Sequence, residues 1–97
     1  MTYRTEFPDF DPTTLPAIPD GWTDQSWHND ACPSFNTGRG MVVFIDFARV
    51  TRRQIDMGGR FVVAPDPETD DRSDALLVTD DWSAVLLFVE SSQRSAR

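Results

Sequence analysis

The longest apolar run with strand character lies in the middle of the chain, at residues 41–48. Val, Ile and Phe dominate this run, and these residue types favour strands. Alternation would place Val43, Ile45 and Phe47 on one face and Val42, Phe44 and Asp46 on the other. A strand that is apolar on nearly both faces is typical of a covered position inside a sheet. We therefore expect residues 41–48 to form the central strand.

Two further apolar runs complete the predicted sheet. Gly58 and Gly59 precede residues 60–64, and glycine supplies the positive φ that a chain reversal needs. Residues 60–64 are therefore predicted to pair antiparallel with residues 41–48. Residues 75–79 are predicted to return as a third strand.

A helix is predicted after the third strand. Thr79 or Asp80 can cap its first amides, and aspartates suit the positive end of the helix dipole. Helical spacing then places four apolar residues on one face: Trp82, Val85, Leu86 and Val89. Leu87 and Phe88 broaden this face, so the helix should be well buried. Residues 84–89 could instead form a fourth strand, and the capping signal favours the helix.

The N-terminal half lacks a clear period. Residues 1–20 contain four prolines, which predict an arm without regular structure that is extended or mobile over residues 1–12. The spacing of Phe7, Phe10, Leu15 and Ile18 would allow this arm to lie along the sheet. Residues 21–37 are rich in short polar side chains and predict a structured loop whose tryptophans are pinned to the core.

The predicted fold is thus α+β and a single domain over residues 1–97. It consists of a small three-stranded antiparallel sheet, one C-terminal helix packed on the sheet, and a long Pro/Trp-rich N-terminal coil. Residues 92–97 lose the helical pattern and are expected to form a frayed tail.

The charge balance narrows the class of partner. Sixteen acidic residues outnumber nine basic ones, for a formal net charge of −7, and every basic residue is arginine. Residues 39–60 run against the trend, with five Arg against two Asp, net +3. An acidic chain is poorly suited to direct nucleic-acid or anionic-membrane binding, and it suits a basic protein partner.

Cysteine usage and hydropathy point to the cytoplasm. Cys32 is the only cysteine, so no disulfide can form within the chain, which favours a reducing compartment. Residues 1–20 carry no signal-peptide pattern, and no apolar stretch is long enough for a membrane span. The oligomeric state stays open, because a free sheet edge could pair with a second copy.

The segment 27–32 holds the only His as well as the only Cys. A structural zinc site needs four ligands, mostly Cys and His, and a Cys–His nucleophile pair needs a third group to orient the base. We therefore predict neither a metal nor a cofactor. In the favoured interpretation His28, Asn29 and Asp30 fix the loop by hydrogen bonds, and Cys32 is a small buried residue.

Asp46 lies between two apolar residues of the central strand. It could be a buried carboxylate with a raised pKa. We favour instead an ion pair with Arg49 or Arg60, which are near in the chain or through strand pairing.

An acidic connection spans residues 65–74, with carboxylates at Asp66, Glu68, Asp70, Asp71 and Asp74. Their spacing does not match an EF-hand calcium loop. Such an acidic run usually forms a solvated, mobile loop. Alternatively, it could form a patch that engages an Arg/Lys-lined groove of another protein.

The stretches 21–35, 44–48 and 79–82 together resemble a group of small uncharacterised proteins found in bacterial genomes and their mobile elements. The first of them reads Gly-Trp-Thr-Asp-Gln-Ser-Trp-His-Asn-Asp-Ala-Cys-Pro-Ser-Phe. This resemblance implies no established activity and assigns no catalytic residue. In size, acidity and lack of catalytic motifs, the chain is also loosely similar to phage anti-CRISPR and other anti-defence inhibitors.

The leading hypothesis is a non-enzymatic protein that binds and inhibits a macromolecular partner, most concretely a nucleic-acid-handling complex with a basic surface. Carboxylates would steer the encounter, and aromatic side chains would form the central anchor. The predicted partner-binding residues are Trp27, His28, Asn29, Asp30, Asp70, Asp71 and Asp74. The alternative is a small-ligand-binding or enzymatic domain with a pocket under the Trp22–Phe35 loop, lined by Asp24, His28, Asp30 and Cys32.

Overall fold

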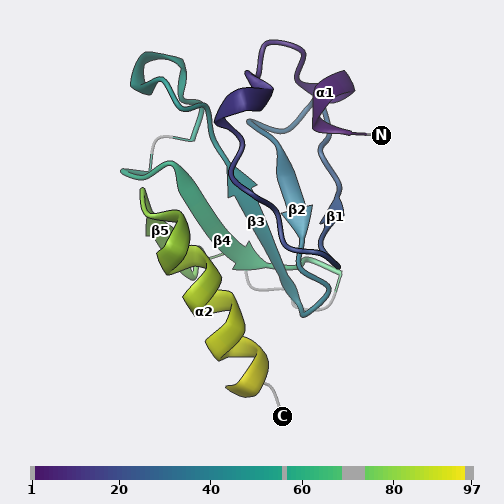
Figure 1. The fold of residues 1–97 in the computed structure, drawn as a ribbon, viewed down its shortest axis with the longest axis vertical. Coiled ribbons are helices and arrows are strands. Elements are labelled where there is room, and N and C mark those ends of the chain that lie inside the picture. Colours follow the sequence, from purple (N-terminus) through teal and green to yellow (C-terminus); the bar gives the residue numbers. More distant parts are fainter. Residues whose placement is uncertain (1, 56, 69–73, 96–97) are drawn as a thin grey trace.

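The computed structural model describes residues 2–55, 57–68 and 74–95, with side chains through Ser91. Its main feature is an antiparallel sheet of five strands in the order β1-β2-β3-β4-β5 (Figure 1). The elements are α1 (Tyr3–Glu6), η1 (Pro12–Thr14), β1 (Thr23–Asp24), β2 (Ser34–Asn36), β3 (Met41–Ile45), η2 (Val50–Arg52), β4 (Phe61–Pro65), β5 (Leu77–Thr79) and α2 (Trp82–Ser95).

The predicted three-stranded sheet is therefore wrong. The two additional strands, β1 and β2, come from residues 21–37, where only a structured loop was expected. They pair through Thr23 with Asn36 and through Asp24 with Phe35. Strands of two and three residues are too short to carry an alternating apolar pattern. The pairing of β2 with β3 and of β1 with β2, rather than local sequence, defines them.

The central position of β3 is confirmed. β3 pairs antiparallel with β2 on one side and with β4 on the other, and Val43 lies opposite Phe35 and Val63. The predicted hairpin between β3 and β4 and the predicted third strand, now β5, are also present. The hairpin is the largest strand pairing in the sheet, since all five residues of each strand take part.

One face of the sheet carries the hydrophobic core. Alternate residues of β3 and β4 supply Val43, Ile45, Phe61 and Val63, all at most 3% exposed. In Figure 1, α2 lies across the β4–β5 half of this face, and the N-terminal segment crosses the β2–β3 half. The cover adds four buried side chains to the core: Phe7, Phe10, Val85 and Val89.

The cap of α2 lies one or two residues after the predicted positions, Thr79 and Asp80. Asp81 is the capping residue, because its Oδ1 accepts hydrogen bonds from Ser83 N at 3.0 Å and Ser83 Oγ at 2.6 Å. Thr79 and Asp80 make other bonds: Thr79 Oγ1 accepts from Asp81 N, and Asp80 Oδ1 accepts from the amide of Arg60. The helix itself is confirmed, and the alternative fourth strand over residues 84–89 is wrong.

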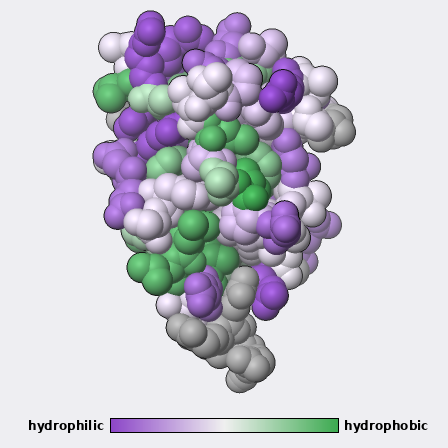
Figure 2. All heavy atoms as spheres, in the orientation of Figure 1, coloured by the Kyte–Doolittle hydropathy of each residue, from purple (hydrophilic) through white to green (hydrophobic). Residues whose placement is uncertain are grey.

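The helix is less buried than its pattern suggested. Val85 and Val89 enter the core, whereas Leu87 is 66% exposed and does not broaden the buried face. Figure 2 shows apolar side chains gathered at the surface over this part of the molecule. The helical backbone continues through Ser95, into the segment 92–97 that was expected to fray.

The N-terminal segment folds onto the sheet and is not an extended arm. Residues 3–6 form α1, and Phe7 and Phe10 are buried. The ring of Tyr3 meets the ring of Phe10 edge to face at 5.8 Å, and the amide of Tyr3 donates to Asp24 Oδ2 at 2.8 Å. This packing joins the segment that carries Tyr3, Phe7 and Phe10 to β1 and to the core.

Asp46 holds the loop that follows β3. Its buried carboxylate accepts hydrogen bonds from the amides of Phe47, Gln54 and Ile55 at 2.8 to 3.1 Å. The predicted ion pair is wrong, because Arg60 donates from Nε to the main-chain oxygen of Asp46 at 2.9 Å. The carboxylate thereby connects the two ends of the loop that contains η2. The three backbone amides supply the hydrogen bonds that a buried carboxylate needs.

Candidate functional site around Trp27 and His28

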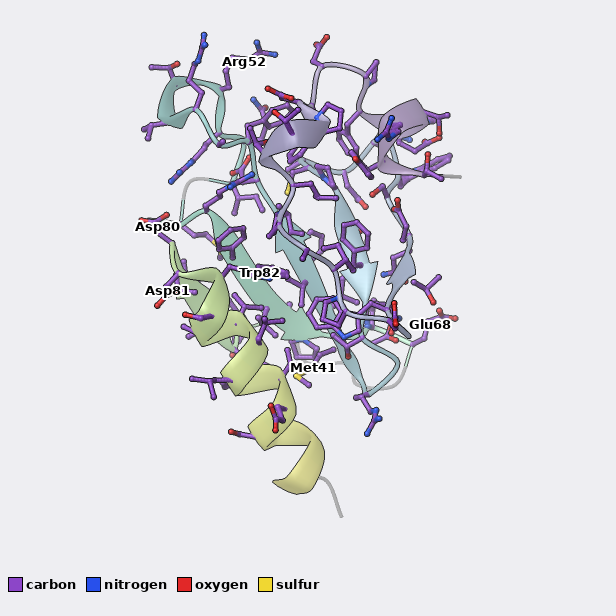
Figure 3. All side chains as sticks on the ribbon, viewed as in Figure 1. Met41, Arg52, Glu68, Asp80, Asp81 and Trp82 are labelled. Atoms are coloured by element: carbon purple, nitrogen blue, oxygen red, sulfur yellow. The ribbon has the colours of Figure 1, made fainter. Side chains whose placement is uncertain are left out.

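Trp27 stands apart from the other two tryptophans. Trp22 and Trp82 pack against the core and meet each other edge to face at 5.9 Å, and Figure 3 shows Trp82 pointing from the start of α2 over the sheet. Trp27 is 40% exposed and belongs neither to the core nor to the side chains packed on it. The expectation that the tryptophans of residues 21–37 are pinned to the core thus holds for Trp22 and is wrong for Trp27.

His28 fixes the position of the exposed Trp27 ring. The two ring centroids lie 4.2 Å apart, with an angle of 43° between the planes. His28 in turn bonds Glu6 of α1 twice, because Oε1 of Glu6 accepts the amide of His28 at 3.1 Å and contacts Nδ1 at 2.8 Å. We call this arrangement the Trp27–His28 platform.

The loop beneath the platform is tied at its base as well. Ser26 is fully buried, and it exchanges hydrogen bonds with Ser34 of β2 through its hydroxyl. The amide of Ser26 also donates to Asp24 Oδ1 at 3.0 Å. A turn in which the amide of Asp30 donates to the carbonyl of Trp27 at 2.8 Å closes the tip. The platform is therefore an ordered surface feature.

The electrostatics of the platform are acidic. The hydrogen bond from His28 lowers the pKa of Glu6 below its usual value, since it favours the charged carboxylate. Asp24 lies in β1 and Asp30 lies exposed in the tip turn, so two further carboxylates come from the same segment. A positively charged surface is the natural counterpart of such a site.

The predicted partner-binding residues come from two segments of the chain, residues 27–30 and the acidic connection. Trp27, His28, Asn29 and Asp30 are contiguous and exposed. Asp30 and Ala75, the neighbour of Asp74, line one hollow of about 260 Å³ on the other face of the sheet from α2. Asp74 itself is exposed and directly precedes Ala75 in the chain. The remaining predicted residues, Asp70 and Asp71, lie outside the described residues.

The residues of the predicted pocket have separate surroundings. Asp24 binds the amides of Tyr3 and Ser26, and His28 binds Glu6. Cys32 is completely buried, and burial raises the pKa of its thiol, which disfavours the thiolate that a nucleophile needs. Among the described residues no cluster of three or more His, Cys, Asp and Glu side chains could hold a metal ion.

Glu6 is the residue of the candidate site that sequence reasoning missed. It lies 22 residues before His28 in the chain, in a segment expected to be extended or mobile. No local pattern marks it, because its role depends on the position of α1 against the loop after β1.

In the described ranges, none of the helices has both the length and the apolar character that crossing a bilayer requires. Comparisons of the chain with protein-family models, curated proteins and solved structures found no match.

Proposed function

We propose that this chain is a non-enzymatic binding protein that uses the Trp27–His28 platform to engage a macromolecular partner. The observation that carries the proposal is the exposed Trp27 ring, which is held by His28 and Glu6 although it contributes nothing to the core. A fixed aromatic side chain loses little conformational entropy when a partner covers it. Tryptophan is also enriched among the residues that dominate binding energy.

The proposed partner presents a basic surface. The chain has a net charge of −7, and the platform is accompanied by the carboxylates of Glu6, Asp24 and Asp30. Asp74 directly precedes Ala75, which lines the neighbouring hollow, and Asp70 and Asp71 belong to the same acidic connection. Opposite charges would steer the encounter and make its rate depend on salt.

The most concrete form of the proposal is an inhibitor of the anti-defence or anti-CRISPR kind. Such a protein would cover a basic nucleic-acid-binding surface and compete with the nucleic acid. The acidic charge and the small size of the chain support this form, as does its resemblance to small proteins of mobile elements. The cytoplasm, where nucleic-acid-handling complexes work, is the compartment proposed for it.

The alternative is a ligand-binding or enzymatic pocket under the Trp22–Phe35 loop, and it receives less support. Asp24 and His28 already bind the N-terminal segment, and Cys32 is buried. Asp30 alone of the four borders the hollow of about 260 Å³.

The test is affinity capture with matched variants. Wild type, Trp27→Ala and Leu87→Ala are immobilised, since Leu87 is another exposed apolar residue far along the chain on α2. Bacterial lysate is applied at low salt, and the retained proteins are quantified before and after a salt step. We expect a salt-sensitive partner on wild type and Leu87→Ala that is lost on Trp27→Ala. Identical captures on all three columns would contradict the proposal.

A competition assay tests the inhibitory form. The captured partner is mixed with labelled nucleic acid, and the chain is titrated in. We expect the chain to displace the nucleic acid, and we expect Asp70→Asn/Asp71→Asn/Asp74→Asn to need a higher concentration. Simultaneous binding of chain and nucleic acid would contradict the inhibitory form and leave a binding protein.

A further inference from the structure

A second feature lies away from the platform, between the N-terminal segment and the loop that contains η2. It is a groove of about 500 Å³ whose lining includes Asp9, Phe10, Asp11, Phe47, Arg49 and Arg52. Figure 3 labels Arg52 at this end of the molecule. Known small-molecule sites fall in a range of about 300–1,000 Å³, so the groove has the size of a ligand site.

The base of the groove is aromatic. The rings of Phe10 and Phe47 pack at 5.2 Å between centroids, and Phe10 is buried. Phe47 is half-buried, and the guanidinium of Arg52 lies 5.6 Å from the centroid of its ring. A flat apolar group could lie on Phe47 in the manner in which aromatic rings stack.

The two walls of the groove carry opposite charges. Asp9 and Asp11 come from the N-terminal segment, and Arg49 and Arg52 come from the loop after β3. Asp9 and Arg52 meet at 3.7 Å, and both side chains are at least half exposed, so this pair contributes little and opens easily. The amide of Arg52 donates to the carbonyl of Arg49 at 2.9 Å, whereas among the residues that the structure describes the guanidinium of Arg49 has no hydrogen-bond or ion-pair partner.

The other two arginines of this region have structural partners. Arg53 donates to the carbonyls of Phe47 and Ala48 and pairs with Asp80. Arg60 donates to the carbonyls of Asp46 and Thr14. Within the described part of the chain, Arg49 has a free guanidinium, and that of Arg52 is held only by its exposed pair with Asp9 and its contact with the Phe47 ring. Both residues stand on the loop that the carboxylate of Asp46 fixes.

We propose that the Phe10–Phe47 groove binds a small dipolar molecule, a zwitterion of amino-acid to dipeptide size with a flat apolar body. Its body lies on Phe47, and its carboxylate binds Arg49 and Arg52, because guanidinium matches the geometry of a carboxylate. Its ammonium group faces Asp9 and Asp11. A simple anion would be repelled by the wall of carboxylates, and a simple cation would be repelled by the wall of guanidiniums. Only a ligand that carries both charges can pair with both walls.

The test uses phenylalanine and two derivatives that each lack one charge. Wild type labelled with ¹⁵N is titrated with phenylalanine, phenylalaninamide and N-acetylphenylalanine, and with the dipeptide Phe-Phe, while amide chemical shifts are recorded. We expect saturable shifts at residues 9–14 and 47–52 with phenylalanine or Phe-Phe. Each single-charge derivative of phenylalanine should bind about tenfold more weakly, the size of one charge-assisted hydrogen bond.

Matched variants assign each charge to its wall. Arg49→Gln should weaken phenylalanine about tenfold and leave phenylalaninamide unchanged, because the amide lacks the carboxylate. Asp9→Asn should weaken phenylalanine and leave N-acetylphenylalanine unchanged. Arg39→Gln is the control, since Arg39 is exposed on the turn between β2 and β3. Absence of shifts with both zwitterions, equal binding of the derivatives, or indifference to Arg49→Gln overturns the proposal.

Discussion

Replacing Asp46 tests how the structure holds the loop that carries η2. Asp46→Ala removes the acceptor of the amides of Phe47, Gln54 and Ile55. A hydrogen bond to a charged group contributes ~1.5–3 kcal/mol, so three of them sum to ~4.5–9 kcal/mol if no water replaced them. Gln54 is exposed and Ile55 is half-buried, so water recovers part of this sum. We expect Asp46→Ala to lower the free energy of unfolding by ~3–4 kcal/mol.

The conservative change should cost less. Asp46→Asn keeps one acceptor oxygen but replaces the other with an NH2 group, which faces backbone N–H donors and cannot accept from them. We therefore expect the free energy of unfolding to fall by ~1–2 kcal/mol. Asp20→Asn, at an exposed aspartate, should stay within about 0.5 kcal/mol of wild type. Because a domain of this size has a stability of ~5–15 kcal/mol, the losses expected for the two Asp46 variants are measurable against this control.

Urea unfolding followed by tryptophan fluorescence measures these differences. The midpoint should shift while the slope of the transition stays constant. Hydrogen exchange adds a local readout, since the amides of Gln54 and Ile55 should exchange faster in Asp46→Asn. A loss below about 1 kcal/mol for Asp46→Ala, or unchanged exchange at these amides, would refute the role assigned to Asp46.

Three more predictions concern the core, a strand contact and pH. Ile45→Ala should lower the free energy of unfolding by ~2–5 kcal/mol in urea titrations, because Ile45 is fully buried. Gly59→Ala should lower the melting temperature, since a Cβ there would lie 2.9 Å from the backbone nitrogen of Thr79. The contact with His28 lowers the pKa of Glu6, so its stabilisation is present above the unfolded pKa and is lost as pH falls through the folded pKa. Between about pH 6 and about pH 3, wild type should therefore lose more stability than Glu6→Gln.

The sequence was informative where the elements are apolar and periodic. The β3–β4 hairpin, β5 and α2 all follow from runs of Val, Ile and Leu with the period of a strand or a helix. The cap of α2 was placed one or two residues early because Thr79, Asp80 and Asp81 are all good capping residues. Only the bonds that the first two make elsewhere leave Asp81 as the cap.

The N-terminal half was the part that the sequence described least well. β1 and β2 are too short for an alternating pattern, and the proline-rich composition of residues 1–20 gave no sign of the short helix α1. Both candidate sites depend on this segment: Glu6 fixes His28, and Asp9 and Asp11 form one wall of the groove. Contacts between residues so far apart in the chain leave no local signal.

The most direct test of the central claim is the affinity of the purified partner for Trp27→Ala, measured by titration calorimetry beside wild type and Leu87→Ala. Loss of a central tryptophan costs ~2 kcal/mol or more, so we expect the dissociation constant to rise about 30-fold or more. Leu87→Ala should bind like wild type. A dissociation constant for Trp27→Ala equal to that of wild type would contradict the account.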